Sequence, residues 1–480
     1  MTQLEEFRQD VYDNVLRRAD ASMELLDALT GNTTARSVVE LSLNGPFRRG
    51  YGSVYTAIGG FFQADPFQRI EDQRRLYDKK LMGLLAPYLP EPEQRPFWLF
   101  GLDVTPAPRP FARTLEDRGF VYQPNTIRGN KPIAIGHQYS TLELLPEKVQ
   151  PQAPPWIVPL SIRRVASAQT GTEVGVNQVE ELLCDDSSPF AEELCVEVAD
   201  AAYSQVPFLG PLSQAHQDNL VTIARVRSNR TLYRPAPPVE KEPGKRGRHP
   251  WYGPVFDLKD PITWGPADKA TEVSYITPRG RHYRVAIEGW QNLLMRGTRA
   301  YEMHQQFFTL LRCQVFNEKG EPVFQRPLWL LVIGARRAEL SLSQTWQAYR
   351  QRYDLEHFFR FGKQRLLMNA YQTPDVEHEE NWWQIVQLAY LQLWMARSLA
   401  QGLPKPWERY LPRPNPEGAS PSATQREFGR ILRQIGTPAQ APKPRGNAPG
   451  RAKGQRPKPR TRHPVLKKGA KKPDQAQRAA

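Results

Sequence analysis

The sequence is poor in cysteine and has no long apolar run. Its three cysteines, Cys184, Cys195 and Cys313, follow neither a disulfide framework nor a metal-ligand spacing. This excludes a zinc-finger protein and predicts reduced thiols in the cytoplasm. No apolar stretch approaches the roughly 20 residues of a membrane-spanning helix, and the first residues lack the character of a signal peptide. We therefore expect a cytoplasmic protein without a membrane partner.

Acidic residues are almost absent from the C-terminal end. Residues 436–480 contain 13 Lys or Arg and one acid, Asp474, so they carry a net charge of +12 out of +15 for the whole chain. This segment also has eight prolines and few large apolar residues, a composition that cannot form a core and predicts disorder. Such a polycation favours nucleic acid as a partner, with a merely solubilising extension as the alternative.

One segment near residue 350 concentrates side chains that bind phosphate and metal ions. Tyr349, Arg352, Glu356 and Lys363 are spaced 3, 4 and 7 residues apart. At about 100° per residue they fall within roughly 60° of one another around a helix. A carboxylate there can ligate a hard metal ion, and the flanking cations can hold phosphate oxygens. Taken alone, the pattern is more often that of a solvated helix face with i,i+4 ion pairs.

Two carboxylates further up the chain favour the functional interpretation. Asp103 closes the apolar run 97–103, and Asp200 closes the run 194–200. Both runs predict buried strands that end in an acid, and ligands bind at the carboxyl ends of strands in α/β sheets. A lone strand-end Asp is usually a helix cap or turn residue. Together with Glu356, however, the two residues form a set of carboxylates able to bind a pair of divalent ions about 4 Å apart.

These residues resemble the DDE motif of bacterial insertion-sequence transposases of the cut-and-paste group. The Y-(2)-R-(3)-E-(6)-K spacing matches at all four positions, and the resemblance covers roughly residues 90 to 400. It implies an α/β fold with an RNase H-like catalytic core. In that core Asp103, Asp200 and Glu356 would be catalytic and would hold two Mg²⁺ ions, for which Mn²⁺ can substitute.

The resemblance also implies a function and partners. The expected reaction is metal-dependent hydrolysis of phosphodiesters at the ends of an insertion sequence, followed by strand transfer. Double-stranded DNA, as element ends and target, is the expected partner, and the protein would act as a homodimer in a synaptic complex at the bacterial nucleoid. The residues expected to contact DNA are Tyr349, Arg352, Lys363, Trp329, and the basic-loop residues Lys245, Arg246 and Arg248.

Two of these expectations have structural alternatives. In the resembling transposases a Trp in the region of Trp329 stacks on a flipped base, but a buried strand Trp fits the run 328–333 equally well. His137 lies on the strand predicted beside that of Asp103. We expect it to be a core histidine, with a place near the metal ions as the alternative.

The chain is expected to divide into five parts. Asp200 and Glu356 are 156 residues apart, far more than the 20 to 40 or so of a helix and loop, so an insertion separates them. Residues 343–367 are predicted to form one helix that carries Glu356. The expected parts are a helical DNA-binding domain or packing cap (1–90), the first part of the core (91–228), a β-rich insertion (229–325), the second part of the core (326–403), and a linker with a disordered tail (404–480).

Two other functions remain open at this level. One is a catalytically inactive, transposase-derived protein that only binds DNA; the three acids argue against it, because binding alone does not require them. The other is an RNase H-like nuclease that cleaves RNA–DNA hybrids, which the long insertion and the Y-R-E-K helix disfavour. Metal-dependent nicking and competition between hybrid and duplex would separate these functions.

Overall fold

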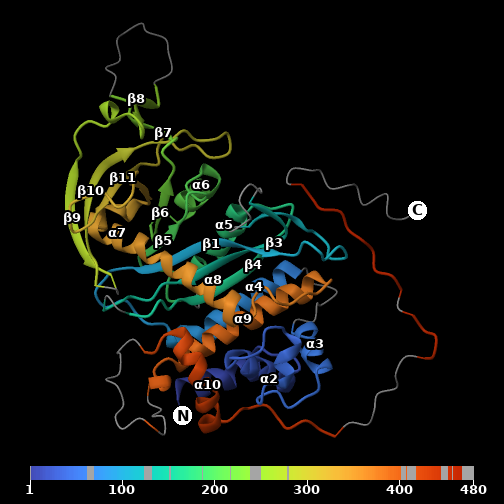
Figure 1. The fold of residues 1–480 in the computed structure, drawn as a ribbon. Helices are drawn as coiled ribbons and strands as arrows, with labels where there is room; N and C mark the ends of the chain where they lie inside the picture. The colour runs from blue at the N-terminus through green and yellow to red at the C-terminus, as the bar shows by residue number, and fades with distance from the viewer. Residues whose placement is uncertain are drawn as a thin grey trace, which may run out of the picture.

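The computed structural model describes residues 2–61, 70–123, 132–150, 153–185, 188–216, 218–237, 250–277, 280–401, 407, 418–444, 452–456 and 458–467. These residues form a mixed α/β fold built around one large mixed sheet (Figure 1). Among the described helices, none is long and apolar enough to cross a bilayer.

The large sheet combines core and insertion strands. Its order is β2-β3-β1-β5-β6-β12-β11-β10-β9. β4 also pairs with β3, outside this order, and β7 and β8 form a separate two-stranded sheet. The strands are β1 (Trp98–Pro108), β2 (Gly119–Tyr122), β3 (Ile133–Leu144), β4 (Val158–Val165), β5 (Cys195–Ala199), β6 (Leu220–Val226), β7 (Thr231–Pro235), β8 (Tyr252–Asp257), β9 (Lys269–Ile276), β10 (His282–Leu293), β11 (Phe308–Phe316) and β12 (Leu328–Ile333).

The helices lie on both faces of this sheet. They are α1 (Gln3–Asn14), α2 (Ala19–Thr30), α3 (Gly52–Gly59), α4 (Ile70–Leu85), α5 (Gly171–Leu183), α6 (Val206–Ala215), α7 (Leu342–Gln351), α8 (Tyr353–Arg365), α9 (Val376–Ala396) and α10 (Pro421–Ile435). Figure 1 shows α7 and α8 following one another across the sheet, with α9 between the sheet and the N-terminal helices.

The first half of the sheet is compatible with the expected RNase H-like core. β3 is antiparallel to β1 and β4, whereas β5 lies parallel to both β1 and β6. The core thus has three adjacent strands, then the helix α5 and then parallel strands. The short strand β2 and the helix α6 were not predicted, because neither carries a long apolar run bounded by turn residues.

The insertion strands continue the same sheet. β12 pairs antiparallel with β6, and β11, β10 and β9 follow outward. A tight turn at 317–320 follows β11, with Gly320 at a φ of 77°, a conformation that favours glycine. The insertion therefore extends the core sheet, and a residue on β9 or β10 lies on one continuous surface with residues of β1.

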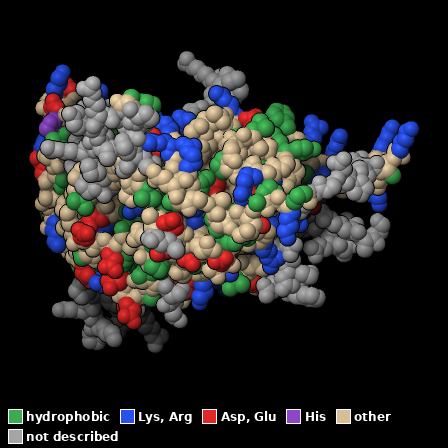
Figure 2. Space-filling model, turned by 90° about the horizontal axis from the view of Figure 1, so that it is seen from below, with side chains coloured by type: hydrophobic (Ala, Val, Ile, Leu, Met, Phe, Trp, Pro, Cys, Tyr) green, Lys and Arg blue, Asp and Glu red, His purple; other side chains and the backbone are tan. Residues whose placement is uncertain are grey.

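The N-terminal helices share their core with α9. Arg8 of α1 forms a buried ion pair with Asp27 of α2 and donates to Gln392 of α9 over 2.6 Å. On the other side of α9, Trp383 stacks on Tyr139 of β3 with ring centroids 3.9 Å apart. Figure 2 views this end of the molecule: Lys and Arg side chains are spread in several groups, and Asp and Glu gather toward the left.

Parts of the C-terminal segment 436–480 make defined contacts, which corrects the expectation that all of it is disordered. Arg48 donates to the backbone oxygen of Ala439 over 2.9 Å, and Ala439 is buried. Further along, the backbone of Leu466 donates to Arg118 over 2.8 Å and pairs with Gly119 at the edge of β2. The free edge of a strand offers backbone partners that composition does not reveal.

A buried carboxyl group in the middle of β5 predicts a pH-dependent stability. Glu197 is fully buried, and this burial raises its pKa to about 8, well above the ordinary value of a glutamate, with the nearby Thr222 opposing the change. A raised folded-state pKa means that the group contributes stability at low pH, which is lost as the pH rises from about 4.5 to about 8. Glu197→Gln should therefore gain on the wild type by roughly 3 kcal/mol between pH 4.5 and pH 7. Urea unfolding of both proteins at the two pH values measures this difference, and parallel pH profiles would contradict it.

Candidate active site

Strand register places three polar side chains in a row at the end of the parallel strands. Leu102 of β1 pairs with Ala199 of β5, which in turn pairs with Ala224 of β6. The next residue on each strand is therefore Asp103, Asp200 and Arg225. Residues in register on parallel strands point to the same face, so these three side chains lie side by side on one face of the sheet.

Helix α8 packs closely on this face. A Cβ atom at Gly101, two residues before Asp103, would lie 2.7 Å from Leu355 Cδ1. The glycine therefore permits the close approach of α8 to β1. Glu356, the neighbour of Leu355, lies at the border of this contact with a side chain that is 44% exposed. Gly101 thus allows α8, which carries Glu356, to lie close to β1, which carries Asp103.

The predicted single helix 343–367 is two helices, α7 and α8, which meet at Arg352. At the joint the backbone hydrogen bonds span three residues: Arg352 N donates to Tyr349 O over 3.2 Å, and Leu355 N donates to Arg352 O over 3.1 Å. A tightened turn of this kind ends one helix and begins the next without a proline or glycine. The sequence pattern is helical on both sides, so the joint could not be predicted.

Arg352 bridges two of the three predicted carboxylates. Its Nη1 lies 3.3 Å from Asp103 Oδ2, and its Nη2 lies 3.5 Å from Glu356 Oε1. Lys363, two turns further along α8, donates to Thr105 Oγ1 over 2.5 Å. Residues at the joint between α7 and α8 and on α8 therefore meet residues from the middle of β1.

The electrostatics of this cluster depart from those of a solvated surface. Burial raises the pKa of Asp103 to about 6, with the charges of Asp200 and Glu356 adding to the rise and that of Arg352 opposing it. Burial also lowers the pKa of Lys363 to about 8, against the attraction of Asp103. Burial raises the pKa of Tyr349 as well. The first two values lie near neutral pH, which is characteristic of functional sites.

The donor set fits a divalent cation. Asp103, Asp200 and Glu356 would supply the hard carboxylate oxygens that Mg²⁺ prefers. A cation bound there would also relieve the mutual repulsion that contributes to the raised pKa of Asp103. The arrangement is not preassembled: in the part of the chain that the structure describes, no three His, Cys, Asp or Glu side chains are gathered as a metal site. Arg352 supplies the positive charge between Asp103 and Glu356 instead.

Trp329 corrects one sequence expectation. Its side chain is only 3% exposed, so it cannot stack on a DNA base in this conformation. It packs in an aromatic cluster with Phe256, Trp264 and Trp290, at ring-centroid distances of 6.4, 5.1 and 5.8 Å. The alternative of a buried strand Trp is therefore correct. Its partners lie far away in the sequence, which is why the cluster could not be recognised there.

Four further positions complete the comparison with the sequence. His137 is buried and lies 3.0 Å from Glu379 of α9, as expected of a core histidine. Lys245, Arg246 and Arg248, the basic loop expected to contact DNA, lie outside the described residues.

Sequence reasoning missed Arg225. Its charge acts on the Tyr349 hydroxyl, and its register puts it beside Asp200. In the sequence, only its place near the end of the run 219–227 marked Arg225. The pairing of β5 with β6 is needed to see that this place is beside Asp200. It adds a cation to the face that carries the carboxylates.

Comparison with known families agrees with this geometry. The family model described as DDE superfamily endonuclease matches residues 10–290, which is more than half of the chain. The matched range contains Asp103 and Asp200 and ends before Glu356, so the choice of the third acid rests on the Arg352 bridge and the motif spacing. No curated protein matches the chain. The family implies a nuclease or transposase enzyme with a DNA substrate, and this chain belongs to the DDE superfamily endonucleases.

Proposed function

We propose that the protein is a DNA transposase that cleaves the ends of an insertion sequence and joins them to target DNA. The catalytic residues in this proposal are Asp103, Asp200 and Glu356. The observation that carries it is the Arg352 bridge between Asp103 and Glu356, at the strand ends where Asp200 lies in register. A purely structural helix face would not require Arg352 of the joint between α7 and α8 to lie between an acid of β1 and an acid of α8.

The chain's own residues would divide the work in a simple way. Bound divalent ions, held by the three carboxylates, would activate the attacking oxygen and neutralise the charge that develops on the phosphate. Arg352, which lies between Asp103 and Glu356, can donate hydrogen bonds to a phosphate oxygen. Lys363, with a pKa of about 8, is still largely protonated at neutral pH and can hold a second oxygen. Tyr349 can donate a hydrogen bond from its hydroxyl group to a phosphate of the DNA backbone.

The proposal includes a homodimer that holds two DNA ends together. It is supported only by the resemblance to cut-and-paste transposases, which cleave in trans. Mixing wild-type protein with an excess of Glu356→Gln protein tests this part, because the yield of DNA cut at both ends should fall with the square of the wild-type fraction if two subunits each cut one end of the same complex.

A plasmid that carries the reading frame with its flanking DNA provides the test of function. With Mg²⁺, the purified protein should cut at both junctions and yield joined products, and chelation with EDTA should prevent both steps. Cutting without joining would indicate a nuclease only. Binding without cutting would favour the inactive DNA-binding alternative. Preferential cutting of an RNA–DNA hybrid would favour the RNase H-like nuclease.

A further inference from the structure

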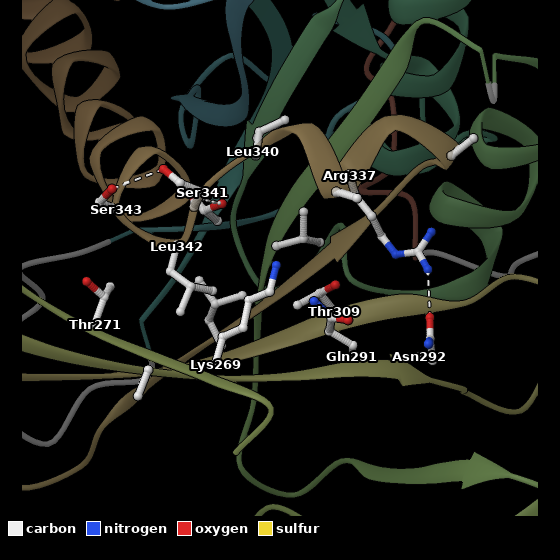
Figure 3. A pocket seen from close by; sticks show the side chains of 16 residues that line it. Lys269, Thr271, Gln291, Asn292, Thr309, Arg337, Leu340, Ser341, Leu342 and Ser343 are labelled. Atoms are coloured by element: carbon white, nitrogen blue, oxygen red, sulfur yellow. Dashed lines mark hydrogen bonds between the residues drawn. The ribbon is translucent and has the colours of Figure 1, made fainter.

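A cavity lies between the insertion strands and the beginning of α7. Its volume is about 530 Å³, and it is lined by residues of β9, β10, β11 and β12 and by the segment that leads from the 3₁₀ helix η4 (Ala335–Glu339) into α7. Figure 3 shows Lys269 extending from β9 toward this segment, with Arg337 on the far side of the cavity. The proposed catalytic residues do not line it, so it is a separate site.

The lining of the cavity is positively charged. It contains two cations, Lys269 and Arg337, and no Asp or Glu. Much of the remaining wall is made of neutral hydrogen-bonding side chains, among them Thr271, Gln291 and Thr309. A site of this composition can both neutralise an anion and donate several hydrogen bonds to it.

Among the residues that the structure describes, no carboxylate forms an ion pair with Arg337. Arg337 Nη2 donates to Asn292 Oδ1 over 3.0 Å, and its Nη1 donates to Gly334 O over 3.1 Å; both acceptors are neutral. The adjacent Arg336, in contrast, forms an ion pair with Glu339 at 2.7 Å. Burial lowers the pKa of Arg337, which reflects the cost of holding a half-buried cation without a counter-charge.

The first turn of α7 adds to the positive electrostatic potential of the cavity. Ser341 caps the helix by accepting from Gln344 N over 3.2 Å, and Ser341 and Ser343 both line the cavity. The N-terminus of a helix carries a partial positive charge. The two cations and the helix end therefore favour the same kind of ligand, an oxyanion.

We propose that this cavity binds a backbone phosphate of the DNA duplex that the Asp103–Asp200–Glu356 site cleaves. The inference rests on the proposed function, since the family's DNA substrate supplies the phosphate. Ser343 precedes Glu356 by 13 residues, which corresponds to about 20 Å along the two consecutive helices. A duplex would span this distance in about six base pairs, at about 3.4 Å each. The phosphate would thus be held on the same face of the sheet, several nucleotides from the scissile bond.

The test compares two double variants of the full-length protein. Lys269→Ala/Arg337→Ala removes both cations of the cavity. Lys259→Ala/Lys319→Ala removes two exposed cations from the same part of the chain, neither of which lines the cavity. Fluorescence anisotropy with a labelled 30-base-pair duplex gives the Kd as a function of NaCl concentration. The cavity variant should lower the slope of log K against log salt by about 0.9 for the one phosphate contact it loses, while the control keeps the wild-type slope. Equal slopes in all three proteins would overturn the proposal.

A free mononucleotide carries the same phosphate chemistry, and a second arm distinguishes it. Calorimetric titration with dAMP should give no heat of tight binding to the wild type if the site takes a phosphate of the duplex. Tight dAMP binding that the cavity variant loses, with an unchanged duplex slope, would make the cavity a nucleotide site and contradict the proposal.

Cleavage of the plasmid by the wild type is scored in parallel. If the wild type does not cleave the plasmid and the cavity variant still lowers the slope, the transposase proposal is contradicted and the phosphate site is supported. If the wild type cleaves the plasmid and the slopes are equal, the transposase proposal is supported and the phosphate site is contradicted.

Discussion

Asp103→Asn, Asp200→Asn and Glu356→Gln should each reduce strand cleavage by about 10³-fold or more, while the affinity for DNA changes little. Each amide keeps the shape of the side chain but removes the negative charge that a divalent ion requires, and groups that act as one catalytic unit lose nearly all activity together. Affinity, in contrast, comes mainly from cations spread over the protein. Rates of plasmid nicking and Kd values from anisotropy measure the two effects separately.

Asp218→Asn is the matched control for these variants. Asp218 is an exposed carboxylate just before β6, at the opposite end of the parallel strands from Asp200, and its loss should leave cleavage within about twofold of the wild type. If one of the three acids can be replaced with as little effect as Asp218, that residue is wrongly assigned. The assignment of Glu356 has the least support of the three, because the family match ends before this residue.

Trp329→Ala should destabilise the protein by about 3 to 5 kcal/mol, the usual cost of replacing a buried aromatic side chain by alanine. The loss includes the packing of Trp329 against Trp264 and Trp290. The control is Trp407→Ala: Trp407 is 76% exposed, and its replacement should change stability by no more than about 0.5 kcal/mol. Urea unfolding measures both variants. A Trp329→Ala protein with wild-type stability and a specific defect in strand transfer would restore the base-stacking role.

The sequence predicted those strands and acids whose signals are local. The run 97–103 is apolar, follows Arg95-Pro96 and ends in Asp103, so a strand there could be inferred. The strand does not end at Asp103, as predicted, because β1 continues to Pro108 through its pairing with β3; only its parallel pairing with β5 ends at Leu102. Asp200 followed from the same logic. The spacing of Arg352, Glu356 and Lys363 likewise predicted that they share a face, because helix geometry relates residues that are close in the chain.

The features that the sequence did not reveal depend on contacts between distant residues. The pairing of β12 with β6 joins the insertion to the core, yet the two strands are about 100 residues apart and carry no mutual signal. The burial of Trp329 depends on rings contributed by β8, β10 and the loop before β9. Arg225 acquires its place from register with Asp200, and register is set by the whole sheet. The cavity beside Lys269 and Arg337 has the same origin, since the two residues meet only after the insertion folds back onto α7.

Counting the ions bound at the site tests the central claim most directly. Electron paramagnetic resonance with Mn²⁺ can measure the number of ions that the protein–DNA complex binds tightly. If Asp103, Asp200 and Glu356 form the metal site, the wild-type complex should bind about two Mn²⁺ per protomer, and the Asp103→Asn/Glu356→Gln variant should bind none at the same concentration. An equal number of tightly bound ions in the two complexes, or none in the wild type, would contradict the account.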